Sequence, residues 1–188
     1  MEVVTIEKFI KSSSLEYNMP IVSKSLVELL QEIEGSKCIF QETISPDSNP
    51  DLFVDLATTD GGSTRIPDCQ YRDKLMQIIT PFYKPHRFKW VTPPDYEPCL
   101  LEAVTNAFER GKPPVTFQIF TGKKGHVLRI EDSGEGFDYQ SKIAEMKSGS
   151  EEFYQRSGGG FKTFERKPYQ VSYEIKGNVF NLQILNGQ

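Results

Sequence analysis

Apolar positions near the start of the chain recur at the spacing of a helix. Between Pro20 and Gly35 they fall at helical spacing, at Val22, Leu26, Leu29, Leu30 and Ile33. This period places them on one helical face, and Gly35 is a typical residue for the end of a helix. We expect one helix here and a less clearly marked one before it.

The next third of the chain combines strand-like and helical segments. Residues 37–44 and 52–58 read as strands, and the segment between them is a loop by its Ser, Pro, Asn and Asp content. Asp68 is a suitable cap for a helix that ends near Pro81. Asp95 is a second such cap, for a helix that stops at residues 110–111, with two Pro at positions 113 and 114 just beyond.

From residue 115 onward the hydrophobic period changes to two. Val115, Phe117 and Ile119 alternate with polar residues, and a Gly-Lys-Lys-Gly turn leads into a return strand at residues 127–131. A short helix is expected near residues 140–147, and a hairpin closes the chain between residues 169 and 185.

This order of elements predicts an α/β two-layer sandwich. A mixed, largely antiparallel sheet would carry helices on one face, with an N-terminal helical extension in front of it. We expect the extension to occupy residues 1–50, with two helices and a strand, and the main domain to occupy residues 51–188.

Composition and charge narrow the function classes. The 188 residues include 37% apolar and 26% charged residues, and 13 Phe and 8 Tyr suffice for a core. The net charge of −4 argues against nucleic-acid binding. No run approaches the ~18 uncharged apolar residues of a membrane span. Three dispersed Cys and two distant His favour neither a disulfide framework nor a zinc site, so a reduced, cytoplasmic protein is expected.

The common nucleotide and hydrolase motifs are absent from the sequence. No Gly-Lys pair is followed by Ser or Thr, as a P-loop requires, and no GxGxxG fingerprint is complete. The GxSxG elbow and the protein-kinase signatures are missing as well. Any nucleotide site must therefore have another architecture.

The helix after Asp95 carries a carboxylate and an amide on one side. Glu102 and Asn106 are four residues apart, so their side chains project from the same face. Such a pair can supply a base and an oxygen ligand for Mg²⁺, which prefers oxygen donors. A solvated polar face is the alternative explanation, and this helix alone does not exclude it.

Two glycine-rich segments could hold a ligand. Asp132 ends a predicted strand, and Gly134 and Gly136 after it allow the backbone to approach a ligand closely. A carboxylate there can accept a hydrogen bond from an amino group such as that of adenine. The segment 157–161, Ser-Gly-Gly-Gly-Phe, precedes a possible helix and would present backbone N–H groups to a phosphate. An ordinary turn and a flexible linker remain the respective alternatives.

Together and in this order, the three segments resemble the N box and the two glycine boxes of the histidine-kinase-like (GHKL) ATPase superfamily. The matches are ExxxNA, DxGxGF and GxGF, and the likeness covers residues 52–185. Within the superfamily, the segment 102–111 is most similar to bacterial anti-sigma-factor serine kinases. The resemblance implies a histidine-kinase-like ATPase fold with a Bergerat-type nucleotide pocket.

The resemblance also implies a role for each matched residue. Asn106 would bind Mg²⁺, Glu102 would be the catalytic base, and Asp132 would recognise the adenine of ATP. The remaining matched residues of the two glycine boxes would also bind the nucleotide, and they would shape the phosphate cradle and its lid. These residues are Gly134, Gly136, Phe137, Gly158, Gly160 and Phe161.

The expected function is a Mg-ATP-dependent serine/threonine protein kinase of anti-sigma-factor type that acts in partner switching. It would bind a sigma factor and phosphorylate an antagonist protein. The alternative is a non-catalytic ATP-binding or protein-interaction module with the same fold. A chaperone or topoisomerase-like ATPase would need further domains. The sequence leaves open the partner's identity, whether the chain forms a homodimer, and the role of residues 1–50.

Overall fold

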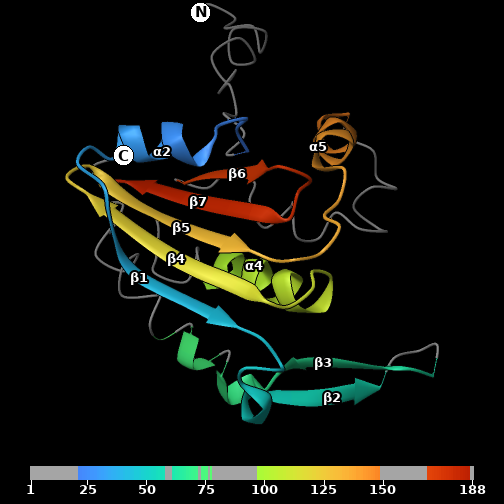
Figure 1. Cartoon of the computed structure of the whole chain (residues 1–188). Coiled ribbons are helices and arrows are strands. Elements are labelled where there is room, and N and C mark those ends of the chain that lie inside the picture. The colour runs from blue at the N-terminus through green and yellow to red at the C-terminus, as the bar shows by residue number, and fades with distance from the viewer. Residues whose placement is uncertain are drawn as a thin grey trace, which may run out of the picture.

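A five-stranded sheet forms the centre of the fold (Figure 1). The computed structural model describes residues 21–57, 61–71, 73–75, 77, 97–148 and 169–186. The strands follow the order β1-β4-β5-β7-β6, and each pairs antiparallel with its neighbours. Their bounds are Lys37–Ile44 (β1), Val115–Gly122 (β4), Gly125–Glu131 (β5), Gln170–Glu174 (β6) and Val179–Leu185 (β7). The predicted α/β class is confirmed. The sheet was predicted to be mixed and largely antiparallel, and all four described pairs of the five-stranded sheet are antiparallel.

Alternating apolar residues give the sheet a buried face. In β4, Val115, Phe117 and Ile119 are buried, whereas the residues between them are partly exposed. Successive side chains of a strand point to opposite faces, so this period turns every second residue toward the core. Strands β5 and β7 continue the same layer with Leu128, Ile130, Phe180, Leu182 and Ile184.

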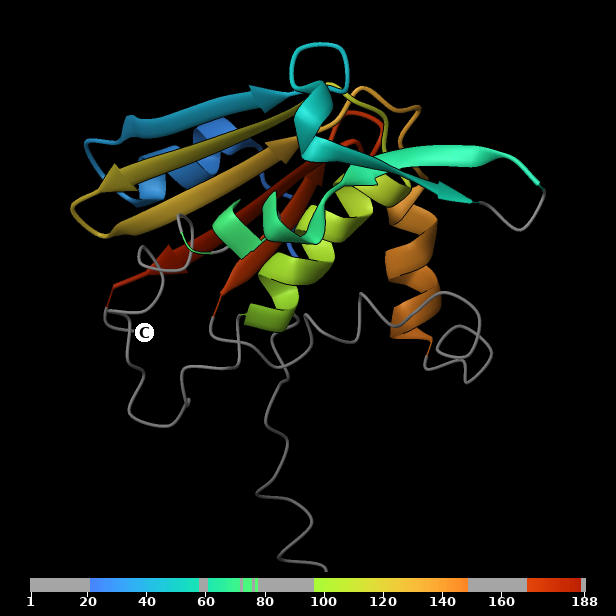
Figure 2. The same ribbon diagram turned by 90° about the horizontal axis from the view of Figure 1, so that it is seen from below.

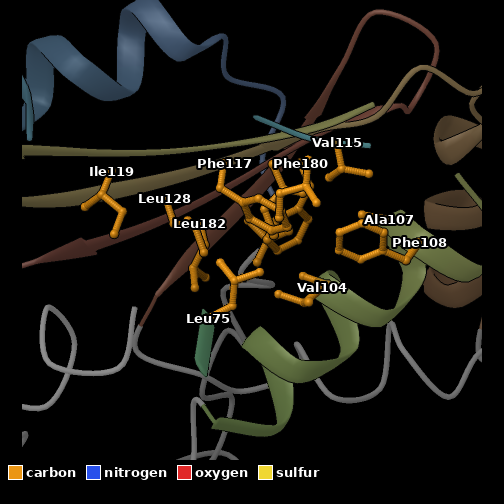
Figure 3. Close-up of a cluster of buried hydrophobic side chains, with 14 of the residues drawn as sticks. Leu75, Val104, Ala107, Phe108, Val115, Phe117, Ile119, Leu128, Phe180 and Leu182 are labelled. Atoms are coloured by element: carbon orange, nitrogen blue, oxygen red, sulfur yellow. The ribbon is translucent and has the colours of Figure 1, made fainter. Parts of the chain in front are cut away.

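Helix α4, Glu97–Glu109, covers this face of the sheet (Figures 2 and 3). Phe108 of the helix stacks on Phe117 of β4, with ring centroids 5.9 Å apart. Buried residues three or four positions apart on a helix form a single stripe. In α4 this stripe consists of Ala103, Val104, Ala107 and Phe108.

A second helix adds to the same core. It is described at residues 69–71, 73–75 and 77, and its Tyr71 and Leu75 are buried. The N–H of Gln70 donates to Oδ1 of Asp68 at 3.2 Å, so Asp68 caps this helix as predicted. The expected helix end near Pro81 and the expected cap Asp95 lie outside the described residues.

Helix α2, Leu26–Glu32, packs on the opposite face of the sheet (Figure 1). Leu29 and Ile33 form a smaller buried cluster with Val127 of β5, whose side chain points away from that of the adjacent Leu128. The prediction that helices cover only one face is therefore wrong. The error concerns the N-terminal extension: its helix α2 adds a third layer to the sheet and α4, where the sequence predicted a two-layer sandwich.

The remaining strands clarify the organisation of the N-terminal half. β1 has the predicted bounds and is an edge strand of the main sheet, although the sequence placed it in the extension. β2 (Phe53–Ala57), which follows the short 3₁₀ helix Pro50–Leu52 (η1), pairs with β3 (Ser63–Pro67) as a separate two-stranded sheet. β3 was not predicted, because its sequence Ser-Thr-Arg-Ile-Pro has almost no apolar alternation. The expected first helix lies outside the described residues.

Candidate functional site

Glu102 and Asn106 lie one turn apart on α4 and contact each other. Nδ2 of Asn106 donates to Oε1 of Glu102 at 3.0 Å, and both side chains are half-buried. Because Nδ2 is engaged with the carboxylate, Oδ1 of Asn106 points away from it, and no described residue donates a hydrogen bond to this oxygen. The two predicted residues thus form one polar unit on the helix.

Asp132 directly follows β5, and its carboxyl group lies at the C-terminal end of α4. A β-carbon on Gly111 would be 2.5 Å from Cγ of Asp132, so the glycine and the carboxyl group are in direct contact. The N–H of Gly111 donates in turn to the backbone oxygen of Asn106 at 3.0 Å. Gly111 therefore connects the helix that carries Asn106 with Asp132, a role that its sequence position as a helix stop did not reveal.

Two backbone groups orient the carboxyl group of Asp132. Oδ1 accepts the N–H of Gly134 at 2.7 Å and the N–H of Lys112 at 3.4 Å. A β-carbon on Gly134 would lie 2.7 Å from the same oxygen, so this approach requires glycine. Oδ2 receives no hydrogen bond from the residues that the structure describes. The carboxyl group is thus fixed through one oxygen and can accept from a ligand with the other.

The surroundings of Asp132 change its acidity. Partial burial raises the pKa of Asp132 above its ordinary value of 3.8, because the charged form loses solvation. The N–H groups of Gly134 and Lys112 oppose this increase, and the nearby charge of Glu131 adds to it. The net effect is a raised pKa, which is common for carboxyl groups in binding sites.

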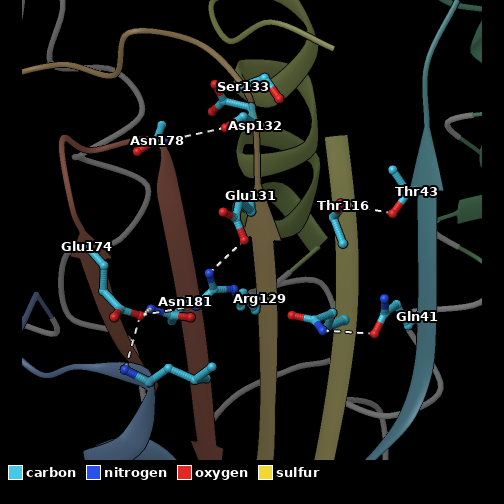
Figure 4. A network of polar contacts seen from close by, with 12 residues as sticks. Gln41, Thr43, Thr116, Arg129, Glu131, Asp132, Ser133, Glu174, Asn178 and Asn181 are labelled. Carbon is cyan, nitrogen blue, oxygen red and sulfur yellow. Dashed lines mark hydrogen bonds and ion pairs between the residues drawn. The ribbon is translucent and has the colours of Figure 1, made fainter. Parts of the chain in front are cut away.

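Asn178 holds the backbone of Asp132 from the side of β7 (Figure 4). The N–H of Asp132 donates to the backbone oxygen of Asn178, and Nδ2 of Asn178 donates to the backbone oxygen of Asp132, both at 3.0 Å. In the sequence, Asn178 is only one residue of the hairpin expected between residues 169 and 185. Its place beside Asp132 depends on the pairing of β5 with β7, which no local pattern reveals.

Gly136 and Phe137 contact the turn between β6 and β7. The N–H of Phe137 donates to the backbone oxygen of Lys176 at 2.7 Å. Gly136 has a φ of +74° and lies so close to that oxygen that a β-carbon would be 2.0 Å from it. The Phe137 ring meets Tyr173 edge-on, with centroids 5.2 Å apart. These two predicted residues therefore anchor the end of the loop.

The second glycine box cannot be placed in this site. Gly158, Gly160 and Phe161, which were expected to shape the phosphate cradle and its lid, lie outside the described residues. The short helix before it is described as α5, Tyr139–Lys147, close to its predicted bounds. Asp138 caps α5, since its Oδ1 accepts the N–H of Ser141 at 3.0 Å.

The side chains of the candidate site could hold a metal ion only if a bound molecule, such as a nucleotide, supplied further oxygen ligands. Among the residues that the structure describes, no three His, Cys, Asp or Glu side chains gather as a metal site. Asn106 would be a single protein ligand, and phosphate and water oxygens would have to complete the shell. Mg²⁺ commonly binds in this way, with few protein ligands beside substrate phosphates.

No protein-family model matches the chain, and no curated protein matches it either. In the described part of the chain, no helix combines the length and apolar character needed to cross a membrane.

Proposed function

We propose that the protein binds Mg-ATP and acts as a serine/threonine protein kinase of the anti-sigma-factor type, with the nucleotide site of the GHKL ATPases. The observation that carries the proposal is the placement of Asp132. Its carboxyl group is fixed by two backbone N–H groups and lies against the end of the helix that bears Glu102 and Asn106. The candidate recognition group, Asp132, thus lies next to the helix that carries the candidate catalytic pair, Glu102 and Asn106.

The base of the nucleotide would bind at Asp132. An ionised carboxylate only accepts hydrogen bonds, so it favours the 6-amino group of adenine over the 6-oxo group of guanine. A charge-assisted bond of this kind contributes about 1.5–3 kcal/mol. The fixed orientation of the carboxyl group means that little side-chain freedom would be lost on binding.

The phosphates and Mg²⁺ would bind near Asn106 and Glu102. Oδ1 of Asn106 is a suitable ligand for Mg²⁺, and Gly134 together with the second glycine box would line the phosphates. Phosphoryl transfer depends mainly on positioning and on neutralising charge, which the bound metal supplies. Glu102 would accept the proton of the incoming serine hydroxyl as its oxygen attacks the γ-phosphorus. The bond from the γ-phosphorus to the β–γ bridging oxygen would break in the same step, and ADP would leave.

Two assays test this proposal in sequence. Titration calorimetry with Mg-ATP, with and without EDTA, tests binding of the metal–nucleotide complex. Incubation with radiolabelled ATP and a cognate antagonist protein then tests transfer, with Glu102→Gln as the control that keeps an acceptor for Asn106. Binding of both ATP and antagonist without labelling of the antagonist would favour the non-catalytic module. The expected partners are a sigma factor and its regulators.

A further inference from the structure

The turn between β6 and β7 contacts both ends of the loop that begins at Asp132. At the first end, Asn178 forms two hydrogen bonds with the backbone of Asp132, each 3.0 Å long. At the second end, the backbone oxygen of Lys176 accepts the N–H of Phe137 at 2.7 Å, and a β-carbon on Gly177 would lie 2.4 Å from the backbone oxygen of Phe137. One turn therefore holds the whole loop in place.

The turn adopts an unfavourable backbone conformation. Ile175 has a φ of +59°, a region that β-branched residues rarely occupy, and the residue is 69% exposed. An exposed side chain gains little from packing, so burial of Ile175 does not account for this conformation. Such outliers persist where the surrounding contacts determine the backbone, and they occur often at binding sites. Here the surrounding contacts include the pairing of β6 with β7 and the contacts of the turn with the loop at residues 132–137.

The amide of Asn178 has a defined orientation. Nδ2 faces the backbone oxygen of Asp132, which can only accept, so the reversed amide would bring two acceptors together. Oδ1 therefore points away from that oxygen, where it is buried without a hydrogen-bond partner among the described residues. Asn178 thus uses its donor to hold Asp132, and a residue without that donor would leave the carbonyl of Asp132 unsatisfied.

We propose that Asn178 is a positioning residue for Asp132, and that it sets how well the site distinguishes a 6-amino purine from purines without that group. The inference rests on the proposed nucleotide site. Asn178 fixes the backbone from which the carboxyl group projects, while Gly134 and Lys112 fix one carboxyl oxygen. A shift of the backbone would displace Oδ2 from the donor, and hydrogen bonds weaken steeply with misalignment.

The test compares two ligands that differ only in the donor. Wild type, Asn178→Asp and Asn178→Ala are titrated with Mg-ATP and with the Mg²⁺ complex of purine riboside 5′-triphosphate, which lacks the 6-amino group. Asn178→Asp keeps the size of the side chain and removes the donor. The matched control is Asn186→Ala, since Nδ2 of Asn186 also bonds a backbone oxygen, that of Lys123, at the other end of the sheet.

The ratio of the two affinities separates positioning from a merely structural role. Misalignment of the Asp132 carboxyl group should cost about as much as one neutral hydrogen bond. In both Asn178 variants, the ratio of the affinity for ATP to that for purine riboside 5′-triphosphate should therefore fall about three- to tenfold. Asn186→Ala should keep the wild-type ratio. Folded Asn178 variants with the wild-type ratio would overturn the inference and leave the proposed function intact. A wild type without preference for ATP would instead refute the proposed adenine site.

Folding of the variants is checked by thermal unfolding before titration. If Asn178→Asp and Asn178→Ala are unfolded at the assay temperature, Asn178→Ser replaces them, because its hydroxyl can still donate over a shorter reach. For Asn178→Ser, we expect the ratio of the two affinities to lie between the wild-type ratio and a ratio lowered tenfold. An unchanged ratio in folded Asn178→Ser would likewise count against a positioning role.

Discussion

Asp132 and Gly134 are held together by a 2.7 Å hydrogen bond from the glycine N–H to the aspartate Oδ1. A β-carbon on Gly134 would lie at the same 2.7 Å from that oxygen, closer than real β-carbons approach. The contact between these two residues therefore depends on the absence of a side chain. The glycine at position 134 therefore helps to set the orientation of the Asp132 carboxyl group.

Replacing Gly134 by Ala should displace the carboxyl group of Asp132 and weaken Mg-ATP binding. The expected loss is about 1.5–3 kcal/mol, the contribution of a hydrogen bond to a charged group. Titration calorimetry measures it. Gly61→Ala is the control: a β-carbon there would meet no atom within 4 Å, so the φ of +83° is the one source of strain in this variant and the candidate site is left untouched. Equal affinities of wild type and Gly134→Ala would disprove the coupling.

The raised pKa of Asp132 predicts how stability depends on pH. The folded protein binds this proton more tightly than the unfolded chain, so the contribution of Asp132 to the free energy of unfolding falls as pH rises from its ordinary pKa of 3.8 to the raised one. Urea denaturation of wild type and Asp132→Asn at several pH values isolates this contribution. The free energy of unfolding of wild type minus that of Asp132→Asn should decrease as pH rises across that window and then stay constant. An increase would mean that the pKa is lowered instead.

Substitutions of Glu102 and Asn106 should have different effects. Asn106→Ala removes the proposed Mg²⁺ ligand and should weaken Mg-ATP binding. Glu102→Gln keeps an acceptor for Nδ2 of Asn106, so binding should persist while transfer to the antagonist falls by about 10²–10⁴. Calorimetry and radiolabel transfer measure the two effects. Full transfer by Glu102→Gln would exclude Glu102 as the base.

The packing of α2 on the second face of the sheet can be tested by stability. Leu29 is fully buried in the cluster with Ile33 and Val127, so Leu29→Ala should cost about 2–5 kcal/mol of unfolding free energy. Val27 is on the same helix but its side chain is 64% exposed, and Val27→Ala should change stability by no more than about 0.5 kcal/mol. Urea denaturation gives both values. Similar small effects would show that α2 does not belong to the folded core.

Local patterns predicted most elements but not their spatial relations. The alternation in β4 and the cap at Asp68 depend only on neighbouring residues, and both agree with the structure. The hydrophobic stripe of α2 indicated that one face is buried, but a stripe does not say against which side of a sheet it packs. This is why the helices were expected on one face only.

The same limit applies to the candidate site. Glu102 and Asn106 share a helix, and Asp132 and Gly134 share a turn, so their proximity followed from spacing. Gly111 and Asn178 reach Asp132 only because α4 lies under β5 and because β7 pairs with β5. Such contacts depend on strand order, which one sequence does not reveal.

The proposed adenine site is tested most directly by titrating wild type and Asp132→Asn with Mg-ATP. Wild type should bind, and the variant should bind about 10- to 150-fold more weakly, which corresponds to ~1.5–3 kcal/mol for the lost charge-assisted bond. Asp47→Asn, at an exposed turn position, should bind like wild type. A wild type that does not bind Mg-ATP, or a folded Asp132→Asn that binds as tightly as wild type, would contradict the account.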